Sequence, residues 1–259
     1  MVDVREVMTA LHTWYPPEIA EPWDSVGVIA GKWDWPVNRV LVSVDIDSEV
    51  LAEAVAKGAD LVLSHHPLAL PRQGGPGFSY KQRLAQRAVS QGIALANAHT
   101  NADHANPGVS DALALALELT ELRPLVALPQ DPALGTGRIG QLPAPMALGE
   151  FAAHVAARVP RARVRVAGSS AVAVHRVALV AGAGDSCLEA ARLSGVDVFV
   201  TSDLRHHPVA EHLEQGGCPV VDVNHQAAEA MWLPLLAERL QSIGLTAMVS
   251  EVDTAHWHF

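Results

Sequence analysis

The sequence predicts an α/β fold made of two similar halves with mixed or parallel sheets, and a metal site in the crevice between the halves. Short apolar segments at 40–44 and 61–63 flank an amphipathic stretch of helical length, which is typical of two parallel strands joined by a helix. The same succession returns at 177–180 and 198–200. Recurrence in a fixed order indicates an internal duplication, and strand ends in such folds line ligand-binding crevices.

The composition is that of an acidic protein with an aliphatic core. Of the 259 residues, 49% are apolar and 18% are charged, and the net charge is −10. This charge opposes binding to nucleic acid or to an anionic membrane, which depends on Lys and Arg. Cys187 and Cys218 fit no disulfide or CxxC pattern. The charged start of the chain does not fit a signal peptide, and no apolar run could span a bilayer. We therefore expect a cytoplasmic protein.

The first half begins with a helix and continues with a strand–helix–strand unit. Asp3 is expected to cap the first helix. After the strand at 40–44, Asp47 or Ser48 is expected to cap a second helix, which Gly58 ends.

The next strand, at 61–63, leads directly into two histidines. His65 and His66 follow it, and Pro67 prevents the strand from continuing. A lone His-His pair is more often a hydrogen-bonded or solvent-facing loop feature than a metal site. The pair therefore needs support from the rest of the chain.

The first half ends with a second polar strand end. A Pro/Gly-rich loop at 71–77 is either a lid or a connection, and a helix at 81–90 leads to a strand at 93–96. His99 and Asp103 follow that strand. A helix starting at Asn106-Pro107 is expected next.

We expect three segments: a first α/β half at 1–120, a connection at 121–149 and a second α/β half at 150–259. The middle segment is rich in Pro and Gly, and one short strand is expected near 138–140.

The second half opens with a helix at 151–157 and a strand on which Arg161, Arg163 and Arg165 alternate with apolar residues. These arginines form either a phosphate or partner patch or a solvated strand face. The acidity of the chain favours the solvated face.

The rest of the second half follows the order of the first. Asp185 is expected to cap a helix that Gly195 ends, and a strand at 219–221 follows. A helix at 230–240 and a strand at 246–251 complete the chain.

Two histidine motifs occur in each half, and the second of them also contains a carboxylate. The motif His65-His66-Pro67 corresponds to His206-His207-Pro208, and His99-x-x-x-Asp103 corresponds to His225-x-x-x-Glu229. His225 and Glu229 would share a helix face if a helix begins there. If the halves converge, imidazoles and carboxylates without thiolates suit two divalent ions of Zn, Fe, Mn, Co or Ni, because one catalytic ion needs fewer ligands.

The sequence resembles the Nif-three-like dinuclear metal-centre proteins, often labelled GTP cyclohydrolase 1 type 2 homologues, over essentially its whole length. The matching segments are Trp23-Asp24-Ser25-Val26-Gly27, Ser64-His65-His66-Pro67-Leu68, His99-Thr100-Asn101-Ala102-Asp103, Gly137-Arg138-Ile139-Gly140, Thr201-Ser202-Asp203, His225-Gln226-Ala227-Ala228-Glu229 and Ser250-Glu251-Val252-Asp253-Thr254. The resemblance implies a hollow toroidal homohexamer. It also implies that two metal ions are held by His65, His66, Asp103, His225 and Glu229.

Some positions depart from the family pattern. Asn224 and Ser202 stand where Gly is usual, and His206 stands where an aromatic residue is usual. The glycine replacements concern the local backbone rather than the ligand set. The resemblance places His207 beside the site, and either His207 or His99 would transfer protons.

The main hypothesis is a metal-dependent hydrolase that acts on a nucleotide or another phosphorylated or purine substrate. Opening of the GTP purine ring is one version, and phosphoester or nucleic-acid hydrolysis is another. An alternative is a metal-binding hexameric scaffold or regulatory interaction protein without fast chemistry. A ring-shaped nucleic-acid-binding protein is a third possibility, suggested by Arg161, Arg163 and Arg165 and opposed by the net charge.

Overall fold

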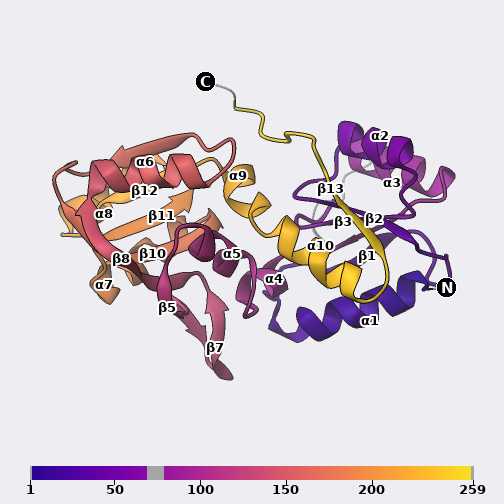
Figure 1. Ribbon diagram of the computed structural model, residues 1–259, viewed down its shortest axis with the longest axis horizontal. Coiled ribbons are helices and arrows are strands. Elements are labelled where there is room, and N and C mark those ends of the chain that lie inside the picture. Colours follow the sequence, from indigo (N-terminus) through magenta and orange to yellow (C-terminus); the bar gives the residue numbers. More distant parts are fainter. Residues whose placement is uncertain (1, 69–78, 258–259) are drawn as a thin grey trace. The chain divides into compact units, whose positions relative to one another are not determined.

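The computed structural model describes residues 2–68 and 79–257 (Figure 1). The chain forms two compact units. Unit 1 comprises Met1–Ala105 and Leu233–Thr254, and unit 2 comprises Asn106–Trp232 and Ala255–Phe259. The chain therefore leaves unit 1 after Ala105, returns to it at Leu233 and leaves it again after Thr254, which differs from the expected linear succession of halves.

Unit 1 is built on a mixed sheet with the strand order β1–β4–β3–β2–β13. The strand β1 is antiparallel to β4, and the other neighbours are parallel. The strands are β1 (Gly27–Ala30), β2 (Arg39–Ser43), β3 (Leu61–Ser64), β4 (Ala94–Asn97) and β13 (Thr246–Val249). The last strand belongs to this sheet because it pairs with β2, although about 200 residues separate the two strands.

Helices cover both faces of this sheet. The helices α2 and α3 lie on one side, and α1 and α10 lie on the other (Figure 1). The helical segments of unit 1 are α1 (Val4–Trp14), η1 (Pro17–Ile19), α2 (Ser48–Lys57), α3 (Tyr80–Ser90), α4 (Thr100–His104) and α10 (Leu233–Ser242). Asp3 caps α1 and Asp47 caps α2, as predicted. The predicted loop at 71–77 lies outside the described residues.

Unit 2 contains a larger mixed sheet with the strand order β5–β8–β10–β11–β12–β9 and a separate β6–β7 ribbon. The neighbours β10, β11 and β12 are parallel, whereas β8 and β9 run antiparallel to their partners. The strands are β5 (Thr120–Arg123), β6 (Val126–Leu128), β7 (Asp131–Thr136), β8 (Arg138–Ala147), β9 (Val164–Ala167), β10 (Ala173–Ala183), β11 (Val198–Ser202) and β12 (Val220–Val223).

The core strands of unit 2 are buried on both faces, as parallel strands between helical layers must be. One face packs against α7 and α8, and α5, α6 and α9 contact β10 as well. The helical segments are α5 (Val109–Ala116), α6 (Leu148–Arg158), η2 (Asp185–Cys187), α7 (Leu188–Ser194), α8 (His206–Glu214) and α9 (His225–Ala230).

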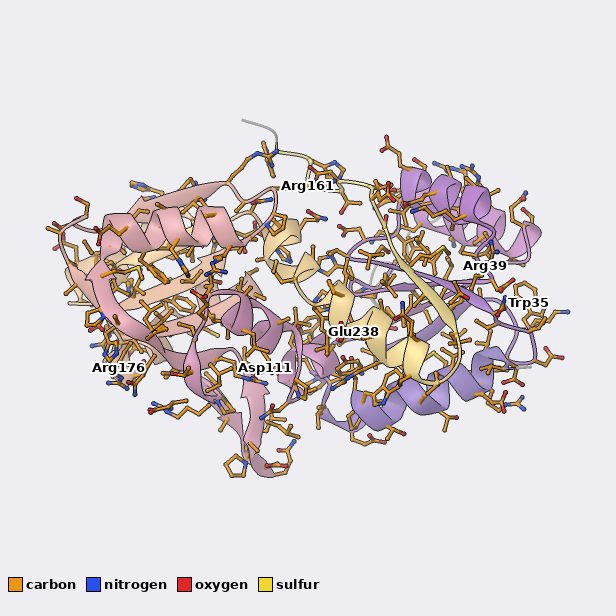
Figure 2. All side chains as sticks on the ribbon, in the orientation of Figure 1. Trp35, Arg39, Asp111, Arg161, Arg176 and Glu238 are labelled. Atoms are coloured by element: carbon orange, nitrogen blue, oxygen red, sulfur yellow. The ribbon has the colours of Figure 1, made fainter. Side chains whose placement is uncertain are left out.

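The same β–α–β–α–β path occurs in both units. The Asp60 carboxylate accepts hydrogen bonds from the backbone amides of Arg39 and the residue before it, and the Asp197 carboxylate accepts from the amides of Arg176 and the residue before it. Arg39 and Arg176 are labelled in Figure 2. In each unit the helix between the first two strands ends on a left-handed glycine, namely Gly58 and Gly195. These matched details support the repetition seen in the sequence; its origin by duplication stays a prediction.

The segment 121–149 forms sheet structure instead of the expected connection with one short strand. The strands β5 and β8 join the main sheet of unit 2, and β6 and β7 form the ribbon. Pro143 and Pro145 lie in β8 between its paired stretches, where no ladder hydrogen bond is required of them. Gly135 and Gly140 are themselves paired with residues of neighbouring strands, so the segment is part of the sheets rather than a linker.

Two local expectations also differ from the structure. The helix expected to start at Asn106-Pro107 begins at Val109, and Gly108 is its N-cap. Asp185 opens the 3₁₀ turn η2 without acting as a side-chain cap. Within the described residues, no helix is long and apolar enough to cross a bilayer.

Candidate metal centre

Unit 1 brings three of the predicted histidines together. His65 and His66 follow β3, and His99 follows β4 as the N-cap of α4. Because β3 and β4 are parallel neighbours, their carboxyl ends share one edge of the sheet. The ring centroids of the three histidines lie 5.0–5.5 Å apart, and one ligand atom from each lies within 4.8 Å of the others.

A backbone carbonyl orients the ring of His65. Its Nδ1 lies 3.0 Å from the carbonyl oxygen of Ala98, and its Nε2 lies 3.7 Å from Oδ1 of Asp103. Asp103 occupies the short helix α4, which directly follows His99. His65 and Asp103 therefore lie close together within unit 1.

His66 is oriented by a carboxylate that lies far away in the sequence. Its Nδ1 lies 2.8 Å from Oδ1 of Asp45, and the hydroxyl of Thr254 donates to the other oxygen of Asp45. Both oxygens of this carboxylate therefore accept a hydrogen bond. The result is a Thr–Asp–His chain that fixes the rotation of the His66 ring.

His99 has a second Thr–Asp–His chain. Its Nδ1 lies 2.8 Å from Oδ1 of Asp24, whose other oxygen accepts from the backbone amide and hydroxyl of Thr100. Burial alone would raise the pKa of Asp24, but hydrogen bonds from His99 and Thr100 outweigh it and hold the pKa well below its usual range. Asp24 is therefore an ionised carboxylate that accepts a hydrogen bond from His99 Nδ1 and holds the ring in position.

Unit 2 contains a separate pair of predicted ligands, His225 and Glu229. The helix α9 begins at His225, so the two side chains share a face, as predicted; His225 Nε2 and Glu229 Oε1 are 2.7 Å apart. His225 Nδ1 lies 2.7 Å from Oδ2 of Asp203, which follows β11 in a left-handed conformation. His225 thus has the same kind of support as His66 and His99.

Gly182 allows Glu229 to lie against the backbone of β10. A Cβ atom built on Gly182 would lie 2.5 Å from Glu229 Oε1 and 3.4 Å from His225 Nε2. Its φ is +93°, a value that side chains rarely adopt. Any larger residue would displace the carboxylate.

The hydrogen-bond acceptors at Nδ1 determine which nitrogen of each ring can coordinate a metal ion. Carbonyl and carboxylate oxygens only accept, so Nδ1 must carry the proton in His65, His66, His99 and His225. In the neutral rings, Nε2 is then the nitrogen with the free lone pair. Metal-binding histidines have this arrangement, because an oxygen on the other ring nitrogen orients the ring and raises its basicity. Together with Asp103 and Glu229, these donors fit divalent transition metals.

The other predicted or discussed positions are placed as follows. His207 is exposed in the first turn of α8, where its ring lies 5.1 Å from that of His206. Ser202 is the buried last residue of β11. Asn224 is the N-cap position of α9, and its side-chain oxygen accepts from the amide of Arg163, so this departure links α9 to the segment before β9.

The three arginines do not form one strand face. Arg161 precedes β9 and has a positive φ of 62° (labelled in Figure 2). Arg165 is exposed and forms an ion pair with Asp222 at 3.0 Å. The structure thus gives Arg165 a partner within the same unit and does not show the regular alternation expected from the sequence.

Sequence reasoning missed Asp45 and Gly182, and it did not give Asp24 or Asp203 a role of its own. Asp45 closely follows a buried strand, which is the signal that singled out the histidines. Gly182 stands at the end of a strand, where a glycine often marks a close approach.

Comparison with known proteins supports a family assignment. The family model described as Duf34/NIF3 (NGG1p interacting factor 3) matches residues 2–256. A Streptomyces coelicolor protein named GTP cyclohydrolase 1 type 2 homolog is 43% identical, over 99% of this chain and 94% of its own length. A Mycobacterium tuberculosis protein with the same name is 30% identical, over 99% of this chain and 97% of its own length.

The fold is also found among solved structures. The crystal structure of a Bacillus cereus protein related to NIF3 has a TM-score of 0.92 with 23% identity, and the match covers 100% of this chain and 99% of the other. Fold and sequence agree, and the chain belongs to the Duf34/NIF3 (NGG1p interacting factor 3) family.

Proposed function

We propose that this protein is a metal-dependent hydrolase that uses two divalent transition-metal ions held by His65, His66, Asp103, His225 and Glu229. One observation carries the proposal. In both units an oxygen atom accepts a hydrogen bond from Nδ1 of each candidate histidine, which leaves the lone pair of Nε2 for a metal ion. Ordinary surface histidines do not need this support.

Two bound ions would supply Lewis acidity and would activate water as a nucleophile. The residues of the chain have the remaining tasks. Asp45 and Asp203 hold the rings of His66 and His225 in position. His99 would accept or donate a proton at Nε2, while Asp24 holds its ring in position. We keep His207 as a second candidate for proton transfer.

A nucleotide or another phosphorylated or purine compound is the proposed substrate. The names of the S. coelicolor and M. tuberculosis relatives point to GTP chemistry. A cavity of about 320 Å³ that includes His66 and His99 in its wall provides room for a small molecule beside the histidines of unit 1. This cavity favours catalysis over a purely structural role for the metal.

Metal analysis tests the ligand assignment. We expect freshly purified protein to contain two transition-metal ions per chain by elemental analysis, and His65→Ala and Glu229→Ala to lower that number. His154→Ala is the control, because His154 lies on α6 and contacts Leu117 and Glu118. Unchanged metal content in both site variants would refute the assignment.

Turnover tests the chemistry. We expect the metal-loaded protein to hydrolyse a member of a panel of nucleotides and phosphate esters, and a chelator to abolish the activity. Full metal occupancy without turnover would instead support the scaffold alternative.

The homohexamer stays a prediction, and nucleic-acid binding stays the alternative that the net charge opposes. Light scattering on the purified protein measures the first. Electrophoretic mobility of DNA with the parent and with an Arg161/Arg163/Arg165 triple alanine variant measures the second. Salt-dependent DNA binding by the parent that is lost in the variant would favour the nucleic-acid alternative.

A further inference from the structure

The cavity of unit 1 is lined by side chains of different chemistry. The lining includes the imidazoles of His66 and His99, the apolar side chains of Ile46 and Leu68, and Tyr80 and Lys81 from α3. The volume of about 320 Å³ lies at the lower end of the range for small-molecule sites. The cavity therefore suits a small ligand that offers both apolar and charged groups.

The charges of the wall favour an anion. Asp45 also lines the cavity, but its two oxygens already accept hydrogen bonds from His66 and Thr254. Lys81 is half-buried and brings an ammonium group to the wall. The first turn of α3 contains no acidic residue, so the helix dipole adds to the positive potential there. The ammonium group of Lys81 and the N-terminus of α3 thus provide a place for an anionic group in this wall, although the whole chain has a net charge of −10.

The aromatic part of the wall favours a planar group. The side chain of Tyr80 is 59% exposed although it is large and mostly apolar. Trp23 is not a lining residue, but it is 54% exposed and its ring lies edge-on to that of the lining residue His99, with a centroid distance of 5.9 Å. Exposed aromatic faces beside a cavity are suited to stacking on a heterocyclic ring.

We propose that this cavity is the substrate-recognition site for a phosphorylated molecule with a planar ring, of mononucleotide size. Lys81 binds the phosphate group and Tyr80 stacks on the ring. Binding there places the ligand against His66 and His99. The inference rests on the proposed hydrolase function for its biological meaning, but it concerns binding and can be tested separately from turnover.

Calorimetric titration of the full-length protein with GMP and with guanosine tests the proposal, in metal-loaded and chelator-treated states. In the chelator-treated protein, bonds between the phosphate of GMP and a metal ion cannot contribute to the measured affinity. Lys81→Met removes the charge and keeps the chain length, and Lys81→Arg keeps the charge. Arg83→Met, two positions further along α3, is the matched control because Arg83 does not line the cavity. Tyr80→Leu and Tyr80→Phe test the ring.

We expect Lys81→Met to weaken GMP binding roughly tenfold to a hundredfold, as for a lost charge-assisted hydrogen bond, and to leave guanosine binding unchanged. Lys81→Arg and Arg83→Met should bind GMP like the parent. Tyr80→Leu should weaken both ligands by about fivefold to a hundredfold, and Tyr80→Phe should weaken neither.

Two results would overturn the inference: a parent that binds GMP in neither metal state, or a Lys81→Met variant that binds it as tightly as Arg83→Met does. The proposed function can fail independently. If Lys81→Met loses GMP affinity but the parent shows no turnover, only the hydrolase proposal fails. If the parent hydrolyses its substrate and Lys81→Met leaves KM unchanged, only the recognition site fails.

Discussion

Substitution of Gly182 by alanine should weaken metal binding without touching a ligand. The new Cβ would lie 2.5 Å from Glu229 Oε1. Ordinary contact begins near 3.4 Å, so the carboxylate must retreat by about 0.9 Å. Metal–ligand distances tolerate deviations of about 0.2 Å. Glu229 therefore cannot keep its position as a ligand.

The size of the effect follows from this displacement. Loss of a group that only orients a ligand lowers metal affinity about 10–100-fold, and displacement of the ligand itself should cost at least as much. The variant also carries backbone strain of about 1–3 kcal/mol, because φ at this position is +93°. A control must separate strain from displacement.

Gly216→Ala provides that control. Gly216 is also in unit 2 and has φ of +76°, but no atom lies within 4 Å of a built Cβ. Zinc affinity measured by competition with a fluorescent chelator should fall in Gly182→Ala and stay at the parent value in Gly216→Ala, with similar melting temperatures for both variants. Glu229→Asp added to Gly182→Ala should recover part of the affinity, because the shorter side chain makes room. Parent-like zinc affinity in Gly182→Ala would refute the reasoning.

Three further predictions concern other parts of the molecule. Arg138→Met should destabilise unit 2 by about 3–5 kcal/mol in urea denaturation, because it leaves the buried carboxylate of Asp111 on α5 (labelled in Figure 2) without its bidentate partner; a loss below about 1 kcal/mol would contradict this. Burial raises the pKa of Cys218 to about 11, with a smaller contribution from a nearby aspartate. The thiolate fraction is then about one in a thousand at pH 8, so iodoacetamide should label this thiol slowly in the native protein, and the rate should rise about tenfold per pH unit up to pH 11; rapid labelling at pH 8 would show that the thiol is not buried. Thr254→Val should lower metal affinity about tenfold, because Asp45 loses the donor that orients it towards His66, whereas Thr254→Ser should bind metal like the parent.

The sequence by itself determined the local features that carry the family assignment. Period-two and period-3.6 patterns located the core strands and most helices, since these patterns depend only on which side chains must be buried. Asp3, Asp47 and Gly58 marked helix ends because capping is a local interaction. The spacing of His225 and Glu229 on one helix face followed from helical geometry alone.

Only the tertiary structure decided how the candidate ligands are supported. Asp24 lies 75 residues from His99, and Thr254 lies 209 residues from Asp45, so no periodicity in the sequence links them. The same holds for β13, which joins the sheet of unit 1 late in the chain, and for the strands in 121–149. Local sequence encodes propensity and caps, whereas strand neighbours and the oxygens facing each Nδ1 are chosen by the burial of the whole chain. The sequence therefore identified the two histidines after β3 as candidate ligands. The fold determined that Nε2, and not Nδ1, is the nitrogen of each that can coordinate a metal ion.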